Sequence, residues 1–308
     1  MLKKNILQIA CLTTIGFSII SPINVSANTL GAWLTYYDEE NGLKDYKQIK
    51  NKINSLSLFQ VYYKNGEPVL HKFNNKIKAK NTYLTFVNDT TKSQKDTDLL
   101  KHIFNDETQI SKMIALTKEQ NCTGIELDFE NFWNDEKLIK EYFSFTYRLY
   151  RECLFNNLKL RIILEPKALN HSTSTDYING PEYVVMLYNL YGKHSGPGAK
   201  ATDDWIEKTI KKMEMLPNKS VAISSGGCIW EVNNTRYISE EDCYKIIPKD
   251  EYMRDSASYD LTYEGKDKII YVADVETLNH QIDLIHKNGI ENIYLWKLGG
   301  NVNLKKIK

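Results

Sequence analysis

Short apolar or aromatic runs alternate with helical patterns along most of this chain, and this alternation restricts its fold more than any other feature. Strands are predicted at residues 30–37, 56–62, 82–87, 124–130, 158–164, 183–188, 220–224 and 292–296. Helices are predicted at residues 106–120, 135–155, 203–215 and 276–287. Because connections this long join parallel strands, about eight such units predict an α/β fold, a closed (β/α)₈ barrel of the TIM type.

Two stretches depart from the alternation. Residues 62–75 predict a small hairpin around Asn65-Gly66. Residues 226–272 are too long for a simple loop and are rich in Tyr and acidic residues, so they predict a small strand-bearing insertion before the last helix–strand unit. No linker rich in Pro, Gly or Ser divides the chain. We therefore expect a single barrel domain over residues 28–308, with an insertion at about 226–272.

The amino terminus has the pattern of an export signal. Lys3 and Lys4 precede an apolar stretch over residues 6–20, and Val25-Ser26-Ala27 supplies the small residues that a signal peptidase reads. We expect residues 1–27 to be a cleaved signal peptide. No later segment approaches the ~18 consecutive apolar residues of a membrane span, so the mature chain is expected to be secreted and free of the membrane.

Composition excludes several classes of protein. Lys and Arg total 40 against 39 Asp and Glu, a formal net charge of +1, so there is no basic excess for nucleic acid. A hydrophobic content of 42% excludes disorder of the whole chain. No CxxC or HxxxH cluster is present, so neither a metal site nor a cofactor is expected. We interpret His171, His194 and His280 as surface or loop residues.

Four cysteines follow the predicted signal peptide, and they allow three disulfide pairings that sequence alone does not distinguish. Cys228 and Cys243 bracket one irregular segment and are the pair we favour. Four buried thiols are the alternative.

The fourth predicted strand carries the strongest signal for chemistry. It contains Glu126, Asp128 and Glu130 on one face and three apolar side chains on the other, because strand side chains alternate. The outer face of a barrel strand packs under helices, so the acids are expected to point into the barrel. Like charges at this range raise the pKa of at least one carboxyl group, as a general acid requires. Glu130 comes last, at the carboxyl end of the strand, where barrel active sites lie.

At this strand the sequence resembles glycoside hydrolase family 18, the chitinase-like enzymes. The family signature Asp-x-x-Asp-x-Asp-x-Glu is matched by Thr123-x-x-Glu126-x-Asp128-x-Glu130. Two acidic positions are identical, Glu126 keeps the charge of a third, and Thr123 replaces the first.

Other segments resemble the family in the same order along the chain. Met186-Leu187-Tyr188-Asn189 resembles its Met-x-Tyr-Asp, and residues 294–299 resemble its last strand with a sugar-stacking Trp. Residues 30–37 resemble its first strand. Residues 195–198 with Trp205, and residues 271–274, resemble bacterial members that act on cell walls or spores.

The resemblance implies a secreted retaining hydrolase of β-1,4-linked N-acetylglucosamine glycans, in which the substrate's acetamido oxygen is the nucleophile. Glu130 would be the acid and then the base, and Asp128 would orient the acetamido group and stabilise the oxazolinium intermediate. Tyr188 would donate a hydrogen bond to the acetamido oxygen, and Glu126 would support Asp128. No cofactor is implied.

Substrate-binding roles follow from the same resemblance and from strand geometry. Met186 and Tyr188 share one face of their strand, and Trp296 is placed to form the floor of a sugar pocket. Asn189 stands where the family has Asp, beside the reacting sugar. Trp33 and Tyr36 belong either to the barrel core or to a sugar subsite.

Three functions remain open at this point. The first is the hydrolase, acting as a monomer on chitin, peptidoglycan or an N-glycan core, either free or associated with a cell wall or spore. The second is a glycan-binding protein on the same barrel that has lost catalysis. The third is a structural or interaction protein. Retention of Glu130 and Asp128 favours the hydrolase.

Overall fold

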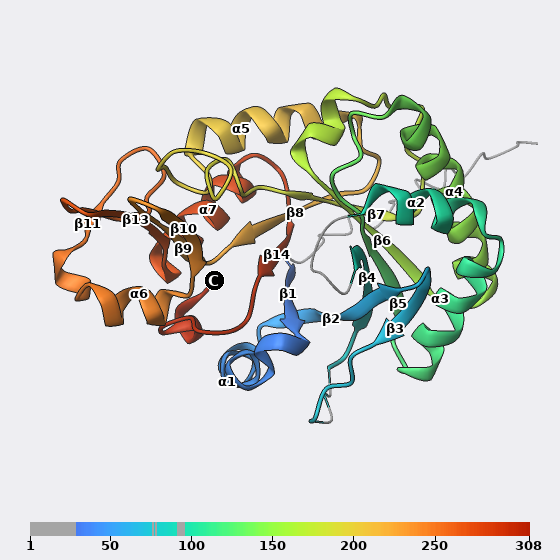
Figure 1. The fold of residues 1–308 in the computed structure, drawn as a ribbon, viewed down its shortest axis with the longest axis horizontal. Coiled ribbons are helices and arrows are strands. Elements are labelled where there is room, and N and C mark those ends of the chain that lie inside the picture. The colour runs from blue at the N-terminus through green and yellow to red at the C-terminus, as the bar shows by residue number, and fades with distance from the viewer. Residues whose placement is uncertain (1–28, 76, 78, 91–95) are drawn as a thin grey trace, which may run out of the picture.

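Eight parallel strands form a closed barrel in the computed structural model, which describes residues 29–75, 77, 79–90 and 96–308 (Figure 1). The pairing of the first strand with the second closes the circle. The predicted (β/α)₈ barrel is therefore confirmed, whereas the predicted signal peptide lies outside the described residues. In order around the barrel the strands are β1 (Thr29–Thr35), β14 (Asn292–Trp296), β8 (Lys219–Ser224), β7 (Glu182–Met186), β6 (Lys159–Leu164), β5 (Gly124–Asp128), β4 (Thr82–Thr90) and β2 (Ile53–Lys64).

Helices between the strands cover the outside of the barrel. All four predicted helices are present, as α3, α4, α5 and α7, while α1, α2 and α6 were not predicted. Two connections contain no α-helix in the described residues: β2 continues into the hairpin strand β3 (Glu67–Leu70), and β6 is followed by the short 3₁₀ helix Pro166–Asn170. The helices are α1 (Glu39–Ile49), α2 (Thr97–Asn105), α3 (Thr108–Glu119), α4 (Glu136–Phe155), α5 (Asp203–Lys212), α6 (Glu240–Ile246) and α7 (Val275–Lys287).

Local signals define the ends of these helices. Asp135 caps α4, because its side chain accepts hydrogen bonds from the backbone N–H groups of Lys137 and Leu138. At the other end of the chain, α7 stops at Asn288, and Gly289 follows with a φ of +79°. Glycine reaches that left-handed conformation without a Cβ penalty, so the chain can leave the helix at this point.

The apolar faces of strands and helices form the main core. On β5, Ile125 and Leu127 are fully buried in it, together with Phe129 just beyond the strand. The ring of Phe129 lies 6.1 Å from that of Phe104 on α2 and 6.5 Å from that of Phe145 on α4. The acidic residues that alternate with these side chains are therefore directed toward the barrel interior, as the pattern predicts.

A second, antiparallel sheet lies between β8 and α7, in the stretch interpreted as an insertion. Figure 1 shows it with α6 at one side of the barrel, opposite α2 and α4. Its own apolar core includes Ile229, Leu261 and Ile270. In order across the sheet the strands are β10 (Asn234–Ile238), β9 (Gly226–Glu231), β13 (Lys268–Ala273), β12 (Leu261–Glu264) and β11 (Met253–Arg254).

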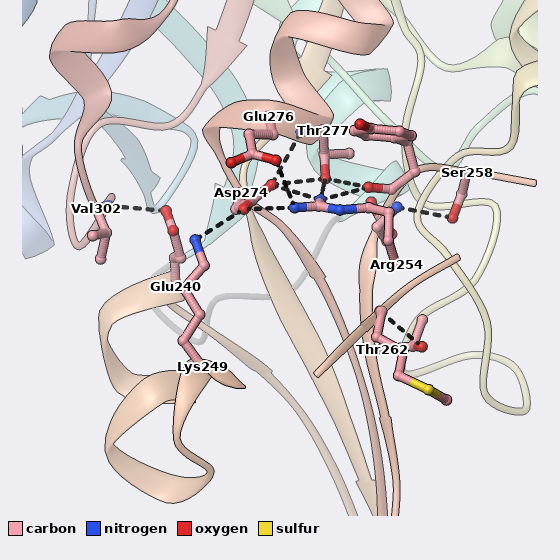
Figure 2. Close-up of polar contacts among 12 residues, drawn as sticks. Glu240, Lys249, Arg254, Ser258, Thr262, Asp274, Glu276, Thr277 and Val302 are labelled. Carbon is pink, nitrogen blue, oxygen red and sulfur yellow. Dashed lines mark hydrogen bonds and ion pairs between the residues drawn. The ribbon is translucent and has the colours of Figure 1, made fainter. Parts of the chain in front are cut away.

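A network of ion pairs and hydrogen bonds between side chains connects this sheet to the start of α7 (Figure 2). Asp274 caps α7 and accepts hydrogen bonds from Arg254 at 2.8 and 3.1 Å, and Lys249 lies 3.2 Å away. Arg254 also reaches Thr277 at 3.0 Å. Burial would raise the pKa of Asp274, but the hydrogen bonds from Arg254 and the backbone N–H of Thr277 outweigh it and lower the pKa to about 2. The insertion is thereby held rigidly against the barrel.

The favoured disulfide between Cys228 and Cys243 is absent, which corrects that expectation. All four cysteines of the described residues are buried free thiols. Cys243 lies in the apolar core of the insertion beside Ile229, and Cys228 is the neighbour of Ile229 on β9. Because successive strand residues point to opposite faces, the thiol of Cys228 is directed away from that of Cys243.

Among the residues that the structure describes, no helix is long and apolar enough to cross a membrane.

One buried cation organises the lower interior of the barrel. Arg161 on β6 is 1% exposed, and its guanidinium donates to Glu126 at 3.0 Å and to Glu182 at 2.9 Å. Its guanidinium carbon lies 3.8 Å from the ring centroid of Tyr83 and 4.0 Å from that of Tyr294. One planar cation, held between two aromatic rings, thus bridges two carboxylates from the strands on either side of β6.

Replacing Arg161 by Met is expected to lower the free energy of unfolding by about 3–5 kcal/mol, because two buried carboxylates lose their counter-ion. Urea denaturation followed by circular dichroism measures the change. The control is Arg151→Met on the exposed face of α4, which should stay within about 0.5 kcal/mol of the wild type. Equal stability of the two variants would contradict the assigned role.

Candidate active site

The bottom of the site is a buried carboxylate that accepts hydrogen bonds from four donors. Glu126, which is 0% exposed, accepts hydrogen bonds from Trp33 Nε1 at 2.5 Å, Ser57 Oγ at 2.7 Å, Thr85 Oγ1 at 2.7 Å and Arg161 Nη1 at 3.0 Å. These donors come from four other barrel strands. The sequence predicted that Glu126 supports Asp128. It did not predict Arg161, which supplies the positive charge beside Glu126. This arrangement makes Glu126 a rigid element below the reaction site.

Above Glu126, the predicted residues Asp128, Glu130 and Tyr188 lie near the barrel mouth. Asp128 ends β5 and is 6% exposed, and Tyr188 is 7% exposed just beyond β7. Burial raises the pKa of the Tyr188 hydroxyl well above its ordinary value, and the charges of Asp128 and Glu130 raise it further. Tyr188 therefore keeps its proton at neutral pH and can act as a hydrogen-bond donor. Its electrostatic coupling to both acids shows that the three side chains share one region.

Glu130 is half-buried, and Asn88 holds its main chain in place. Asn88, which is 0% exposed at the end of β4, donates from Nδ2 to the carbonyl oxygen of Glu130 at 3.0 Å. The N–H of Glu130 donates back to Asn88 Oδ1 at 2.9 Å. One amide side chain thereby satisfies both backbone groups of Glu130, which lies beyond the ladder of β5. The sequence analysis missed this contact.

A further carboxylate, Glu165, lies beside Glu130 at the end of β6. Its side chain is 14% exposed and accepts a hydrogen bond from the backbone N–H of Asn131 at 2.7 Å. Burial raises the pKa of Glu165, and the charge of Glu130 raises it further. The mouth of the barrel thus places acidic groups from two adjacent strands close together, a setting in which one of them readily holds a proton.

Trp296 forms one side of an aromatic cluster in the upper barrel. Its ring lies 5.8 Å from that of Trp33 and 5.3 Å from that of Phe59, both in edge-to-face geometry. Trp296 is half-buried and lines the cleft described below. Trp33 is 1% exposed and Met186 is 5% exposed, so both belong to the interior packing and present almost no surface to a ligand.

Tyr36 occupies a different place from the other predicted aromatics. It stands in the short 3₁₀ helix after β1, and its ring stacks on His71 with centroids 4.1 Å apart. Tyr62 stacks on the other face of His71 at 4.3 Å. The three half-buried rings form a continuous aromatic stack beside the mouth, built from β1, β2 and the segment after β3. Of the two roles left open for Tyr36, burial in the barrel core is therefore excluded.

A cleft with a volume of about 780 Å³ separates the barrel mouth from the insertion. Of the predicted substrate-binding residues, Trp296 and Asn189 line it. Asn189 is exposed and has a φ of +66°, a left-handed conformation that asparagine tolerates better than most residues. Tyr237 of β10 lines the opposite wall, and its pKa is raised by burial and, among the neighbouring charges, by that of Glu130. Asp128, Glu130 and Tyr188 are not among the residues that line this cleft, and the charge of Glu130 reaches it only through its influence on Tyr237.

Glu240 connects the cleft wall to the carboxyl-terminal segment. It is 2% exposed and accepts hydrogen bonds from the N–H of Val302 at 2.9 Å and from Tyr244 Oη at 3.0 Å (Figure 2 shows the first). Burial raises its pKa to about 7. A carboxyl group at the edge of this cleft thus changes charge near neutral pH.

The functional residues that sequence reasoning missed are isolated polar side chains. Arg161 is a single cation within the apolar strand 158–164, which signals a buried ion pair with an inward-facing acid. Asn88 directly follows the strand 82–87, at the end where barrel sites form. Neither signal identifies a partner. Among the residues that the structure describes, no group of three or more His, Cys, Asp or Glu is arranged to hold a metal ion.

Comparisons with known proteins identify the fold of this chain. No family model matches the chain, and no curated protein matches it. Solved structures that match its fold include a chitinase from Chromobacterium violaceum ATCC 12472, with a TM-score of 0.74 and 13% identity over 91% of this chain and 96% of that one. The spore cortex-lytic enzyme SleL of Bacillus cereus matches with a TM-score of 0.75 and 16% identity over 91% and 72% of the two chains. A class V chitinase from Nicotiana tobaccum, solved in complex with NAG4, matches with a TM-score of 0.70 and 11% identity over 91% and 97%. The chain therefore has the chitinase-like barrel fold.

The pKa of Glu240 predicts how stability changes with pH. Its folded pKa of about 7 lies above the ordinary 4.5, so the stabilisation by the protonated form is complete below pH 4.5 and is lost as the pH rises through 7. The variant Glu240→Gln should lose less stability than the wild type over that range, by about 1–3 kcal/mol. Urea denaturation at about pH 4 and about pH 8 measures this difference. Glu241→Gln, at an exposed neighbouring position, is the control and should follow the wild type. If Glu240→Gln also follows the wild type, the assignment is wrong.

Proposed function

We propose that this protein is a retaining glycoside hydrolase that cleaves β-1,4 linkages in glycans containing N-acetylglucosamine. The proposal rests on three positions at the barrel mouth: Asp128 ends β5, Glu130 follows it, and the buried Tyr188 follows β7, with its hydroxyl influenced by both acids. The cleft lined by Trp296 supplies a floor on which a sugar ring can stack. Chitinases and a spore cortex-lytic enzyme share the fold, which supports this class of substrate.

The first step forms an oxazolinium ion from the substrate itself. The acetamido oxygen of the bound sugar bonds to its C1 while the bond from C1 to the leaving oxygen breaks, and Glu130 gives its proton to that oxygen. Asp128 accepts the acetamido N–H and balances the positive charge that develops. Tyr188 donates to the acetamido oxygen, which its raised pKa supports because the hydroxyl stays protonated.

The second step releases the product with its configuration retained. A water molecule bonds to C1, Glu130 takes its proton, and the bond from C1 to the acetamido oxygen breaks. Glu130 alternates between acid and base, so its backbone must stay fixed through both steps, which is the role we assign to Asn88. Export and a monomeric state remain predictions from the sequence.

Replacing Glu130 by Gln should lower the turnover of N-acetylglucosamine oligomers by about 10²–10⁴-fold, because a general acid–base group is removed. Glu152→Gln, on the exposed face of α4, is the matched control and should retain activity. Product analysis by chromatography, with proton NMR of the first-formed anomer, measures both rate and stereochemistry. N-acetylglucosamine oligomers, peptidoglycan and an N-glycoprotein are the three substrates.

Each result of this assay decides between hypotheses. Appearance of the β anomer first supports acetamido participation, whereas the inverted product excludes it. Binding of glycan by the wild type and by Glu130→Gln, without cleavage by either, would make the protein a glycan-binding barrel.

The contact of Asn88 predicts a graded loss of activity. Asn88→Ala removes both hydrogen bonds to the backbone of Glu130 and should reduce kcat by about 10–100-fold while KM changes little. Asn88→Asp keeps the acceptor and loses the donor, so it should fall between the wild type and Asn88→Ala. Steady-state kinetics together with thermal unfolding separates misplacement of Glu130 from general instability. Equal losses in kcat and thermal stability, with no difference between the two variants, would contradict a positioning role.

A further inference from the structure

Lys200 is a cation on the cleft wall that the proposed mechanism does not use. It stands in the loop between β7 and α5, is half-buried, and lines the cleft together with Asn189 and Trp296. Its ammonium donates to Ser224 Oγ at 3.0 Å and to the carbonyl oxygen of Ser225 at 2.8 Å. An ammonium group has three donors, so these two neutral acceptors fix its position and leave one N–H for a ligand.

Other cations on the cleft wall have carboxylate partners, whereas Lys200 has none within the described chain. Lys297 Nζ lies 2.5 Å from Asp38 Oδ2, and Lys245 Nζ lies 2.8 Å from Asp242 Oδ1. No ion pair joins Lys200 to an acid of the described residues. Taking an ammonium partly out of water without a counter-ion is unfavourable, which makes the site attractive to an anion from solution.

The acid that influences Lys200 most does not neutralise it. Asp260 is 1% exposed in the insertion, and burial raises its pKa to about 8, so this carboxyl group is mostly uncharged at neutral pH. Burial lowers the pKa of Lys200 to about 8, so its ammonium is mostly charged at the same pH. The pair therefore carries a net positive charge under physiological conditions.

Neighbouring groups extend this positive surface toward the insertion. The ammonium groups of Lys193 and Lys200 lie 5.4 and 5.8 Å from the ring centroid of Tyr237. Arg236, next to Tyr237 on β10, also lines the cleft, and its guanidinium lies 3.9 Å from the carboxylate of Glu231. An aromatic ring flanked by cations suits a sugar that carries an acidic substituent, since the C–H face packs on the ring and the acid meets the ammonium.

We propose that Lys200 binds a carboxylate carried by the glycan, so that the preferred substrate is an acidic N-acetylhexosamine polymer with free ether-linked lactyl carboxylates, as in peptidoglycan stripped of its stem peptides, rather than neutral chitin. The occupant follows from the proposed function, because a glycan that stacks on Trp296 lies in the cleft that Lys200 also lines.

The test compares one ligand in two charge states. A tetrasaccharide of alternating N-acetylglucosamine and N-acetylmuramic acid, with free lactyl carboxylates, is titrated calorimetrically beside its methyl ester. Both are measured with the full protein carrying Glu130→Gln, which prevents cleavage. We expect the free acid to bind about 10–100-fold more tightly than the ester, from one charge-assisted hydrogen bond in a partly desolvated cleft.

Variants at two lysines show where the preference arises. In the same background, Lys200→Met should bind acid and ester equally, and Lys200→Arg should keep the preference for the acid. Lys245→Met is the matched control, because Lys245 lines the same cleft but is paired with Asp242. It should retain the preference of the parent protein. Thermal unfolding checks that each variant is folded.

The outcomes separate this inference from the proposed function. Equal affinity of the parent protein for acid and ester, or binding of neither, overturns the inference whatever the variants do. A preference for the acid that survives in Lys200→Met also overturns it. A preference that requires Lys200, in a protein whose wild type cleaves no glycan, would support the carboxylate site and refute the hydrolase.

Discussion

The site depends on a buried ion network at the base of the barrel. Arg161 lies between Glu126 and Glu182 and is enclosed by two tyrosine rings. Without this cation, Glu126 would be an uncompensated charge in the interior and β5 could not hold its acidic face inward. Because Asp128 and Glu130 continue the same face, the ion network fixes the direction in which the reactive acids point. The buried ion pairs of Arg161 thereby determine where the carboxyl groups of Asp128 and Glu130 lie.

The wall of the cleft carries charges of both signs. Lys200 and Arg236 line it together with Asp38, Glu240 and Asp242. The ion pairs around Asp274 in Figure 2 connect the insertion to α7. Among the lysines of this wall, Lys297 and Lys245 are paired with acids, whereas Lys200 has no carboxylate partner in the described residues and is available to an anionic ligand.

Particular residues show how far sequence reasoning extends. The alternation over residues 124–130 predicted the inward acids, of which the structure buries Glu126 and Asp128 and leaves Glu130 half-buried at the mouth. The face predicted to be shared by Met186 and Tyr188 is buried in the interior. The expected disulfide failed because Cys228 and Cys243 lie on different faces of the insertion sheet. The helices α1, α2 and α6 were missed, whereas the hairpin in the connection after β2 was predicted. The helix-free connection after β6 was not foreseen, because a crossover between parallel strands needs length but no particular secondary structure.

Periodicity along the chain determined the strands, most of the helices, the barrel and the acids that enter it, since these follow from which face of each element is apolar. The tertiary structure alone decided the partners: Arg161 with Glu126, Asn88 with the backbone of Glu130, and Lys200 without a carboxylate. Each of these depends on residues that are distant in sequence and adjacent only after the barrel closes. A single polar side chain has no period, so its role is set by the strands that surround it.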